Sequence, residues 1–174
     1  MITITIAKEE HLPQILRILR ETISPEWTYD AFLSEMQKSD SLFLVAVDET
    51  GEPSPCLQPP LQFAAPSSTE EDYTVVGFAV FRQVGDDGEL LQIAVDGAVR
   101  RRGVGDSLMT TTLDYAKTNA LNSVFLEVRE GNVAAVRLYR KHGFEIVRVR
   151  KDYYNNPVED ALVMIKNGDK NESI

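Results

Sequence analysis

The sequence predicts a mixed α/β domain in which a mostly antiparallel sheet carries helices on both faces. Most of the strand-like segments follow one another along the chain, which favours antiparallel pairing between neighbours. One strand-like segment is instead followed by glycines and an amphipathic helix, which predicts a single parallel crossover. At 174 residues the chain is long enough to bury a sizeable core as one domain, expected to span residues 1–166.

The first half of the chain mixes strand-like and helical patterns. Ile2, Ile4 and Ile6 alternate with threonines, as expected for a strand with one buried face. Longer segments with apolar residues three or four apart follow, and then two apolar runs rich in β-branched residues. The expected elements are strand 2–6, helix 8–21, helix 28–38, strand 41–47 and strand 73–82.

An irregular segment separates these last two strands. Residues 50–72 hold five of the eight prolines and a run of serines and acidic residues, so a regular element is excluded. We expect an inserted surface loop, and a tolerated insertion is favoured over a substrate gate. Its Cys56 is the single cysteine of the chain, which excludes an internal disulfide. The polar tail 167–174 is expected to fray.

The second half contains the crossover. Val104, Leu108, Met109, Thr112 and Ala116 are spaced three or four apart, which predicts a helix with one buried face. A helix of this kind after a strand and glycines carries the chain back along the sheet, so that the next strand runs parallel to the first. The expected elements are strand 89–95, helix 104–119, strand 123–128, helix 133–142, strand 144–151 and strand 160–166.

The net charge is -9, which argues against a nucleic-acid partner because such proteins need clustered Lys and Arg. An acidic surface favours a basic protein partner, although plain solubility explains the charge equally well. No apolar run approaches the roughly 20 residues of a membrane span, so we expect a cytoplasmic protein without a membrane partner. No spacing of His, Cys and carboxylates matches a metal site.

A glycine loop joins strand 89–95 to helix 104–119. It has the spacing R-x-x-G-x-G, from Arg100 through Gly103 to Gly105. Backbone amides at a helix start attract anions, and glycines allow a phosphate to approach the backbone. The loop lacks the Gly-Lys-Ser/Thr of nucleoside triphosphate sites and has Leu108 where a dinucleotide site has its third glycine. A pyrophosphate is the expected guest, and a simple tight turn is the alternative.

A second motif follows the loop. Residues Leu126 to Phe144 read L-E-V-x-x-x-N-x-x-A-x-x-L-Y-x-x-x-G-F, and a Tyr153-Tyr154 pair comes later. With the glycine loop, this pattern strongly resembles the GNAT acetyltransferase superfamily and, within it, the RimI-type ribosomal-protein-alanine N-acetyltransferases. The resemblance covers about residues 89–164. It implies the GNAT fold, acetyl-CoA as co-substrate, and transfer to the N-terminal alanine of a basic protein such as a ribosomal protein.

Two side chains carry the expected chemistry. Glu127 interrupts an apolar strand, where a carboxylate is costly without a partner or a task. It could reach solvent or pair with Arg129 or another base, whereas the resemblance implies a general base acting through water. The resemblance also implies that Tyr139 is the general acid for the leaving thiolate. A core tyrosine with a satisfied hydroxyl is the alternative.

The resemblance implies further contacts with the cofactor. Residues 93–95 would pair with the pantetheine through their backbone, the glycine loop would bind the pyrophosphate, and Asn132 would contact the pantetheine or simply cap a helix. Asp106 departs from the family pattern, because it places a negative charge beside a bound anion unless it turns to solvent. The expected cofactor-binding residues are Ile93, Ala94, Val95, Arg100, Arg101, Arg102, Gly103, Val104, Gly105, Asp106 and Asn132.

The resemblance places Tyr153 and Tyr154 on the last hairpin, where they would bind the first residues of the acceptor. The expected reaction is direct transfer in a ternary complex, without a covalent enzyme intermediate. Two alternatives remain at this point. One is a GNAT enzyme that acetylates a lysine or a small amine, and the other is a non-catalytic acyl-CoA-binding domain.

Overall fold

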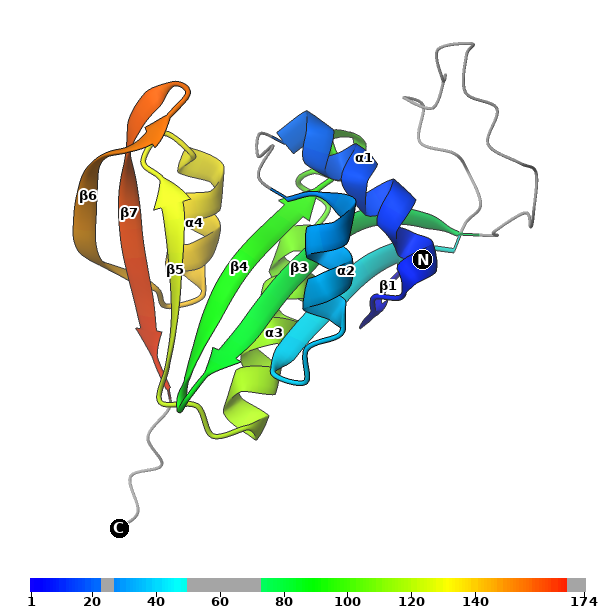
Figure 1. Cartoon of the computed structure of the whole chain (residues 1–174), viewed down its shortest axis with the longest axis horizontal. Helices are drawn as coiled ribbons and strands as arrows, with labels where there is room; N and C mark the ends of the chain where they lie inside the picture. The colour runs from blue at the N-terminus through cyan, green and yellow to red at the C-terminus, as the bar shows by residue number, and fades with distance from the viewer. Residues whose placement is uncertain (23–26, 50–72, 169–174) are drawn as a thin grey trace.

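The computed structural model describes residues 1–22, 27–49 and 73–168. These residues form one seven-stranded sheet with the strand order β1-β2-β3-β4-β5-β7-β6 (Figure 1). The predicted α/β fold class is therefore confirmed. The strands are β1 (Ile2–Ile6), β2 (Ser41–Asp48), β3 (Thr74–Val84), β4 (Asp87–Val95), β5 (Ser123–Arg129), β6 (Glu145–Asn155) and β7 (Val158–Asn167). The helices are α1 (Leu12–Thr22), α2 (Tyr29–Met36), α3 (Val104–Thr118) and α4 (Val133–Lys141).

The sheet contains one parallel pair, as predicted. All neighbouring strands are antiparallel except β4 and β5, which α3 connects. The parallel pairing is short: it runs from Gly88 and Val124 to Leu90 and Leu126. Beyond this point the two strands diverge, as the ribbons in Figure 1 show, and we call this diverging region of the backbone the β4–β5 opening.

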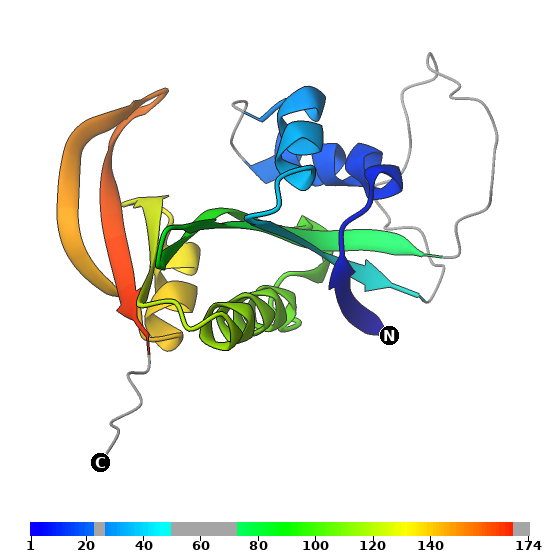
Figure 2. The same cartoon turned by 60° about the horizontal axis from the view of Figure 1, so that its bottom comes forward.

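Helices cover both faces of the sheet. Figure 2 shows α1 and α2 above the sheet and α3 and α4 below it. Each layer has its own apolar core: Phe32 of α2 packs with Phe43 and Phe78 on one face, whereas Leu108 and Met109 belong to the core on the other. All of these side chains are buried, which anchors the glycine loop at the start of α3 to the sheet.

Several boundaries differ from the sequence prediction. The expected helix 8–21 is split into a 3-10 turn, Glu9–His11, and α1, because the His11 ring accepts a hydrogen bond from the Lys8 amide and closes the first turn. A second 3-10 turn, Gly97–Val99, was not predicted. Strand β6 continues to Asn155 rather than residue 151, so Tyr153 and Tyr154 lie within a strand.

The proline-rich segment 50–72, with Cys56, and the tail from residue 169 lie outside the described residues.

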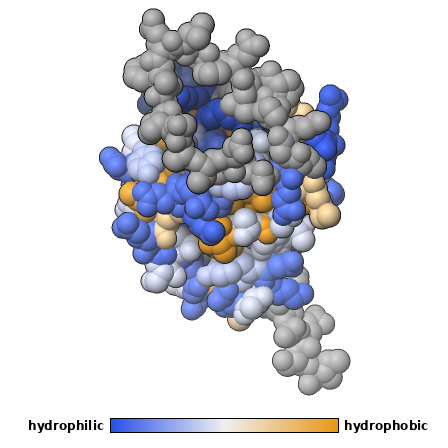
Figure 3. All heavy atoms as spheres, turned by 90° about the vertical axis from the view of Figure 1, so that its right-hand side faces the viewer, coloured by the Kyte–Doolittle hydropathy of each residue, from blue (hydrophilic) through white to orange (hydrophobic). Residues whose placement is uncertain are grey.

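On the side of the molecule where β1 lies, hydrophilic side chains predominate and apolar ones gather in a small central area (Figure 3). Within the described part of the chain, no helix is both long and apolar enough to cross a membrane.

Candidate active site

The opening between β4 and β5 forms the centre of the candidate site. Because pairing with β5 ends at Leu90, residues 93–95 of β4 have β3 as their only strand partner, and the Val95 carbonyl also accepts a hydrogen bond from Arg100 Nε at 3.4 Å. Every second backbone N–H and C=O along this edge therefore points into the opening without a strand partner. This is the backbone that the resemblance assigned to the pantetheine. Glu127 is the first residue of β5 beyond the last paired position.

The glycine loop lies between the end of β4 and the start of α3. Gly103 is the N-cap of α3 and has φ of 84°, a left-handed conformation that β-branched residues avoid. No side chain caps the first turn of α3, and nothing lies within 4 Å of the position that a Cβ on Gly103 would take. The first amides of the helix therefore have no side-chain cap, which leaves them available to an anion. Arg100, Arg101 and Arg102 are exposed beside them.

Asp106 lies in the first turn of α3, where the sequence suggested an unfavourable negative charge beside a bound anion. Its partners in the structure explain how this charge is tolerated. Its carboxylate does not stand alone beside the loop, although its side chain is 38% exposed to solvent. One oxygen accepts a hydrogen bond from Lys141 Nζ at 2.7 Å and contacts His142 Nε2 at 2.8 Å. These two contacts lower the pKa of Asp106. The negative charge is therefore balanced by side chains from the end of α4.

Glu127 is held by two side chains of β6. Its Oε1 lies 2.9 Å from Arg150 Nη1, and a hydrogen bond to Glu127 raises the pKa of Tyr153. The Glu127 side chain is 25% exposed, so its carboxylate reaches the open side of the sheet. The Arg150 guanidinium also lies 5.3 Å from the centre of the Tyr153 ring. The alternative of pairing with another base therefore holds in this structure, although the base is Arg150 rather than Arg129.

Tyr139 lies on α4 in a buried position, with its ring 6.0 Å from that of Phe144. Burial, and then the neighbouring Tyr154, raise the pKa of Tyr139 above its ordinary value, so the hydroxyl keeps its proton. Tyr154 in turn packs its ring 5.2 Å from Tyr153. Tyr153 therefore bonds to the predicted base, and Tyr154 lies close enough to the predicted acid to raise its pKa.

Comparison with known proteins assigns this arrangement to a family. Residues 12–144 match the model of the Acetyltransferase (GNAT) family. The chain belongs to the GNAT acetyltransferase family. It is 37% identical over 95 residues to the [ribosomal protein bS18]-alanine N-acetyltransferase of Salmonella typhimurium, a match covering 53% of this chain and 64% of that enzyme. The enzyme of the same name from Haemophilus ducreyi is 32% identical over 99 residues, covering 55% and 68%.

A solved structure agrees with these sequence matches. The ribosomal-protein-S18-alanine N-acetyltransferase from Escherichia coli superposes with a TM-score of 0.76 at 25% identity, covering 100% of this chain and 99% of that one. The predicted GNAT fold is confirmed. The sequence match to the Salmonella enzyme spans somewhat less than two thirds of that relative.

In this GNAT chain Asn132 acts as the N-cap of α4. Its side-chain oxygen accepts a hydrogen bond from the Ala135 amide at 3.2 Å, which confirms the capping role. The side-chain NH2 group is left for another partner, so capping and a cofactor contact are compatible.

Sequence reasoning missed one arginine, Arg150 of β6, and the true partners of another, Arg129 at the end of β5. Arg150 pairs with Glu127, and the Arg129 guanidinium lies 4.0 Å above the Tyr154 ring while binding Glu159 at 3.1 Å. Irregular pairing between β6 and β7 shifts their register twice, so alternation along the sequence could not show which side chains face β5. The one available signal was Glu127, a carboxylate within an apolar strand that had no assigned cation.

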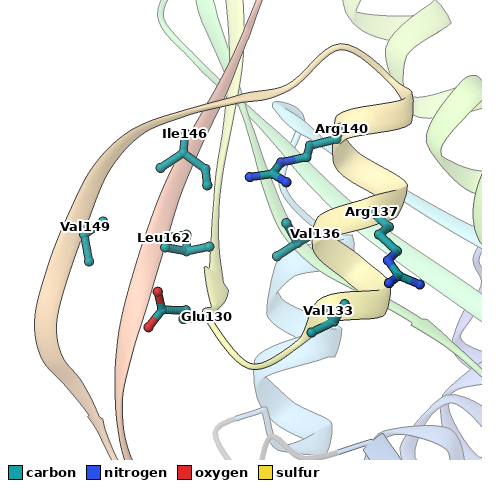
Figure 4. Close-up of a pocket in the computed structure, with 8 residues that line it drawn as sticks. All are labelled: Glu130, Val133, Val136, Arg137, Arg140, Ile146, Val149 and Leu162. Carbon is teal, nitrogen blue, oxygen red and sulfur yellow. The ribbon is translucent and has the colours of Figure 1, made fainter.

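A groove between α4 and strands β6 and β7 is separate from these residues. Val136 and Leu162 point toward each other across it, and Ile146 and Val149 line its β6 side (Figure 4). Its volume is about 490 Å³, and neither Glu127 nor Tyr139 lines it. Among the described residues, no cluster of three or more His, Cys, Asp or Glu side chains could hold a metal ion.

Proposed function

We propose that this GNAT chain transfers the acetyl group of acetyl-CoA to the N-terminal α-amine of a protein, most specifically the N-terminal alanine of a ribosomal protein. One observation carries the proposal: Glu127 is the first β5 residue past the last β4–β5 pair, and Arg150 and Tyr153 of β6 hold its carboxylate there. The names of the Salmonella, Haemophilus and Escherichia relatives support this choice of acceptor.

The cofactor would bind along backbone rather than side chains. The pantetheine would add to the free edge of β4 at residues 93–95, as an extra strand adds to a sheet. The pyrophosphate would lie at the open amides of residues 103–106, where the α3 dipole favours negative charge. The exposed Arg100, Arg101 and Arg102 add positive charge, and the NH2 group of Asn132 is free to contact the pantetheine.

The reaction needs a neutral amine, an attacked carbonyl and a proton for the thiolate. Glu127 would accept a proton from the acceptor ammonium, directly or through water. The free amine then attacks the thioester carbonyl, the C–S bond breaks, and the sulfur takes the Tyr139 hydroxyl proton. The nitrogen, cationic after attack, loses its extra proton as the amide forms, which restores the Tyr139 hydroxyl, and Glu127 releases its own proton to solvent. Tyr139 suits this task because its raised pKa keeps it protonated until the thiolate develops. The products are an amide and free CoA, and no covalent enzyme intermediate forms.

Tyr153 and Tyr154 would form one wall of the acceptor site. Tyr153 is 45% exposed although its hydroxyl bonds to Glu127, so its ring faces both the base and solvent. Such a ring offers an apolar surface to the first side chain of a peptide. The net charge of -9 suits a basic acceptor such as a ribosomal protein.

The test is direct acetylation. Purified protein is incubated with acetyl-CoA and ribosomal protein bS18, and mass spectrometry locates the acetyl group on the product. We expect it on the N-terminal alanine, with release of free CoA. Acetylation confined to lysine side chains would contradict the N-terminal assignment and favour a lysine acetyltransferase. Tight CoA binding without turnover on any protein amine would favour a non-catalytic acyl-CoA-binding domain.

A further inference from the structure

Asp96 occupies the junction between the two segments that the proposed function assigns to the cofactor. Strand β4, with the free edge at residues 93–95, ends one residue before it. The 3-10 turn Gly97–Val99 begins one residue after it and leads into the glycine loop. The direction in which the chain leaves Asp96 therefore sets the distance between the free strand edge and the anion-binding amides.

The backbone and side chain of Asp96 are both fixed. Its amide donates to the Val76 carbonyl at 2.9 Å, and its Oδ1 accepts from the Ala98 amide at 2.9 Å, which caps the 3-10 turn. Its Oδ2 accepts from Arg17 Nη1 at 2.8 Å. The Asp96 side chain is 1% exposed, so this carboxylate depends on its partners for solvation.

Arg17 connects this junction to α1, on the opposite face from α3. Its Nη2 donates to the Val75 carbonyl at 3.3 Å, and Gln14, one turn earlier on α1, accepts from the Val75 amide at 2.8 Å. The β2–β3 register shifts here, pairing Val75 with Val47 and leaving Val76 as the extra residue on β3. Side chains of α1 thus bind the backbone of β3 beside a bulge, and the same arginine holds Asp96.

We propose that Arg17 and Asp96 are positioning residues of the cofactor site. Neither would touch the cofactor; they fix the turn that places residues 100–106 relative to residues 93–95. This inference rests on the proposed function, because both flanking segments are assigned to acetyl-CoA. The backbone contacts on the two sides of the turn must fit the same bound ligand at once, so a shift at the turn weakens their combined fit.

The test uses isosteric variants and calorimetry with CoA. Asp96→Asn keeps the size of the side chain and the cap on Ala98 but removes the charge facing Arg17, and Arg17→Met removes the cation. We expect the CoA dissociation constant to rise by about tenfold or more in both variants, by analogy with other supporting residues. Arg17→Lys should recover part of the affinity, because it keeps the charge but not the two-pronged geometry. At saturating acetyl-CoA, kcat should stay near the wild-type value while KM for acetyl-CoA rises.

Glu35→Gln is the matched control. Glu35 is an equally buried carboxylate, bound to Arg82 at the other end of β3 and far from the loop in sequence. Its loss should lower stability but leave the CoA dissociation constant within about twofold, inside the usual range for independent sites. Wild-type affinity in Asp96→Asn and Arg17→Met would overturn the positioning role, as would equal weakening in Glu35→Gln.

One outcome would contradict the proposed function rather than this inference, and another would leave the decision to the Arg17 variants. Failure of wild-type protein to bind CoA would contradict the proposed function before any variant is measured. If Asp96→Asn does not fold, the Arg17 variants decide the question, because that side chain is 21% exposed and its replacement leaves the core intact.

Discussion

At the scale of single residues, Glu127 and Tyr139 occupy opposite environments. Glu127 is partly exposed, paired with Arg150 and bonded to Tyr153, so its charge is solvated by protein groups on the open side of the sheet. Tyr139 is buried, and its raised pKa preserves the neutral form. The carboxylate in the polar, partly exposed environment is suited to act as the base, and the phenol in the buried environment is suited to act as the acid of the same reaction.

Tyr139→Phe tests the acid. The substitution removes one hydroxyl and keeps the ring that packs on Phe144, so fold and CoA affinity should be retained. We expect kcat to fall by about 10²-fold or more, the usual cost of losing a general acid. Steady-state kinetics with matched calorimetry checks this, and an unchanged kcat would leave Tyr139 a core residue only.

Glu127→Gln tests the base. The variant cannot accept a proton, so it depends on acceptor molecules that are already neutral. We expect kcat/KM to fall most at low pH and to recover partly as the pH rises and free amine becomes abundant. A pH–rate series on both proteins is the measurement, and parallel profiles would contradict the assignment.

The residue-level chemistry could be predicted from the sequence only in part. Glu127 was visible as a carboxylate within an apolar strand, and Asn132 as a helix cap. Arg150 was not, because the shifted β6–β7 register decides which side chains face β5. The partners of Asp106 were missed for a similar reason: Lys141 and His142 come close only when the end of α4 packs beside the start of α3.

At the scale of elements, the turn before α3 and the anchor of α2 are each set by a few contacts. Periodicity predicted α3 and its buried face, because apolar spacing alone decides which side of a helix meets the sheet. It could not predict the 3-10 turn at Gly97–Val99, since that turn depends on Asp96 and Arg17, which are 79 positions apart. Short irregular segments are determined by such tertiary contacts rather than by local pattern.

Gly103→Val tests the loop that precedes α3. Space for the side chain exists, so the effect comes from the left-handed φ of 84° and from branched carbons that would cover the open amides. The backbone strain should cost about 1–2 kcal/mol of folding free energy. We expect CoA affinity to fall sharply in the folded variant. Calorimetry with thermal unfolding as a control checks both, and unchanged affinity would remove the loop from the cofactor site.

Glu35 anchors α2 to the sheet in a pH-dependent way. Burial opposes ionisation, but hydrogen bonds from Arg82, Lys38 and Ser41 outweigh it and lower the pKa of Glu35 from 4.5 to about 2. Because the folded pKa lies below the unfolded value, the ionised anchor stabilises the fold above about pH 4.5, and this contribution is lost as the pH falls toward 2. Denaturant unfolding should show a steeper acid loss in wild-type protein than in Glu35→Gln. Equal slopes would contradict the anchor.

At the scale of the whole molecule, the sheet is continuous on one side and divided on the other. Strands β1 to β4 hold α1 and α2, while β5, β7 and β6 form a curved hairpin unit that meets β4 over only three residue pairs (Figure 1). The proposed cofactor would fill the opening between the two parts. The acceptor would meet the cofactor beside the hairpin tyrosines. Both substrates would therefore bind where β4 and β5 diverge.

The central claim is transfer to an N-terminal α-amine, and proton energetics favour it. Near pH 7 an α-amine with a pKa of about 8 costs roughly 1.4 kcal/mol to deprotonate, against roughly 4.6 kcal/mol for a lysine of pKa about 10.4. A single carboxylate such as Glu127 is better matched to the smaller cost.

A competition between two peptides tests this claim most directly. One peptide begins with a free alanine and has its lysines blocked, and the other has the same sequence with a blocked N-terminus and one free lysine. Both are incubated together with the protein and acetyl-CoA, and mass spectrometry follows each product over time. We predict that the free-alanine peptide is acetylated at a far higher rate. Equal rates, or faster acetylation of the lysine peptide, would contradict transfer to the α-amine.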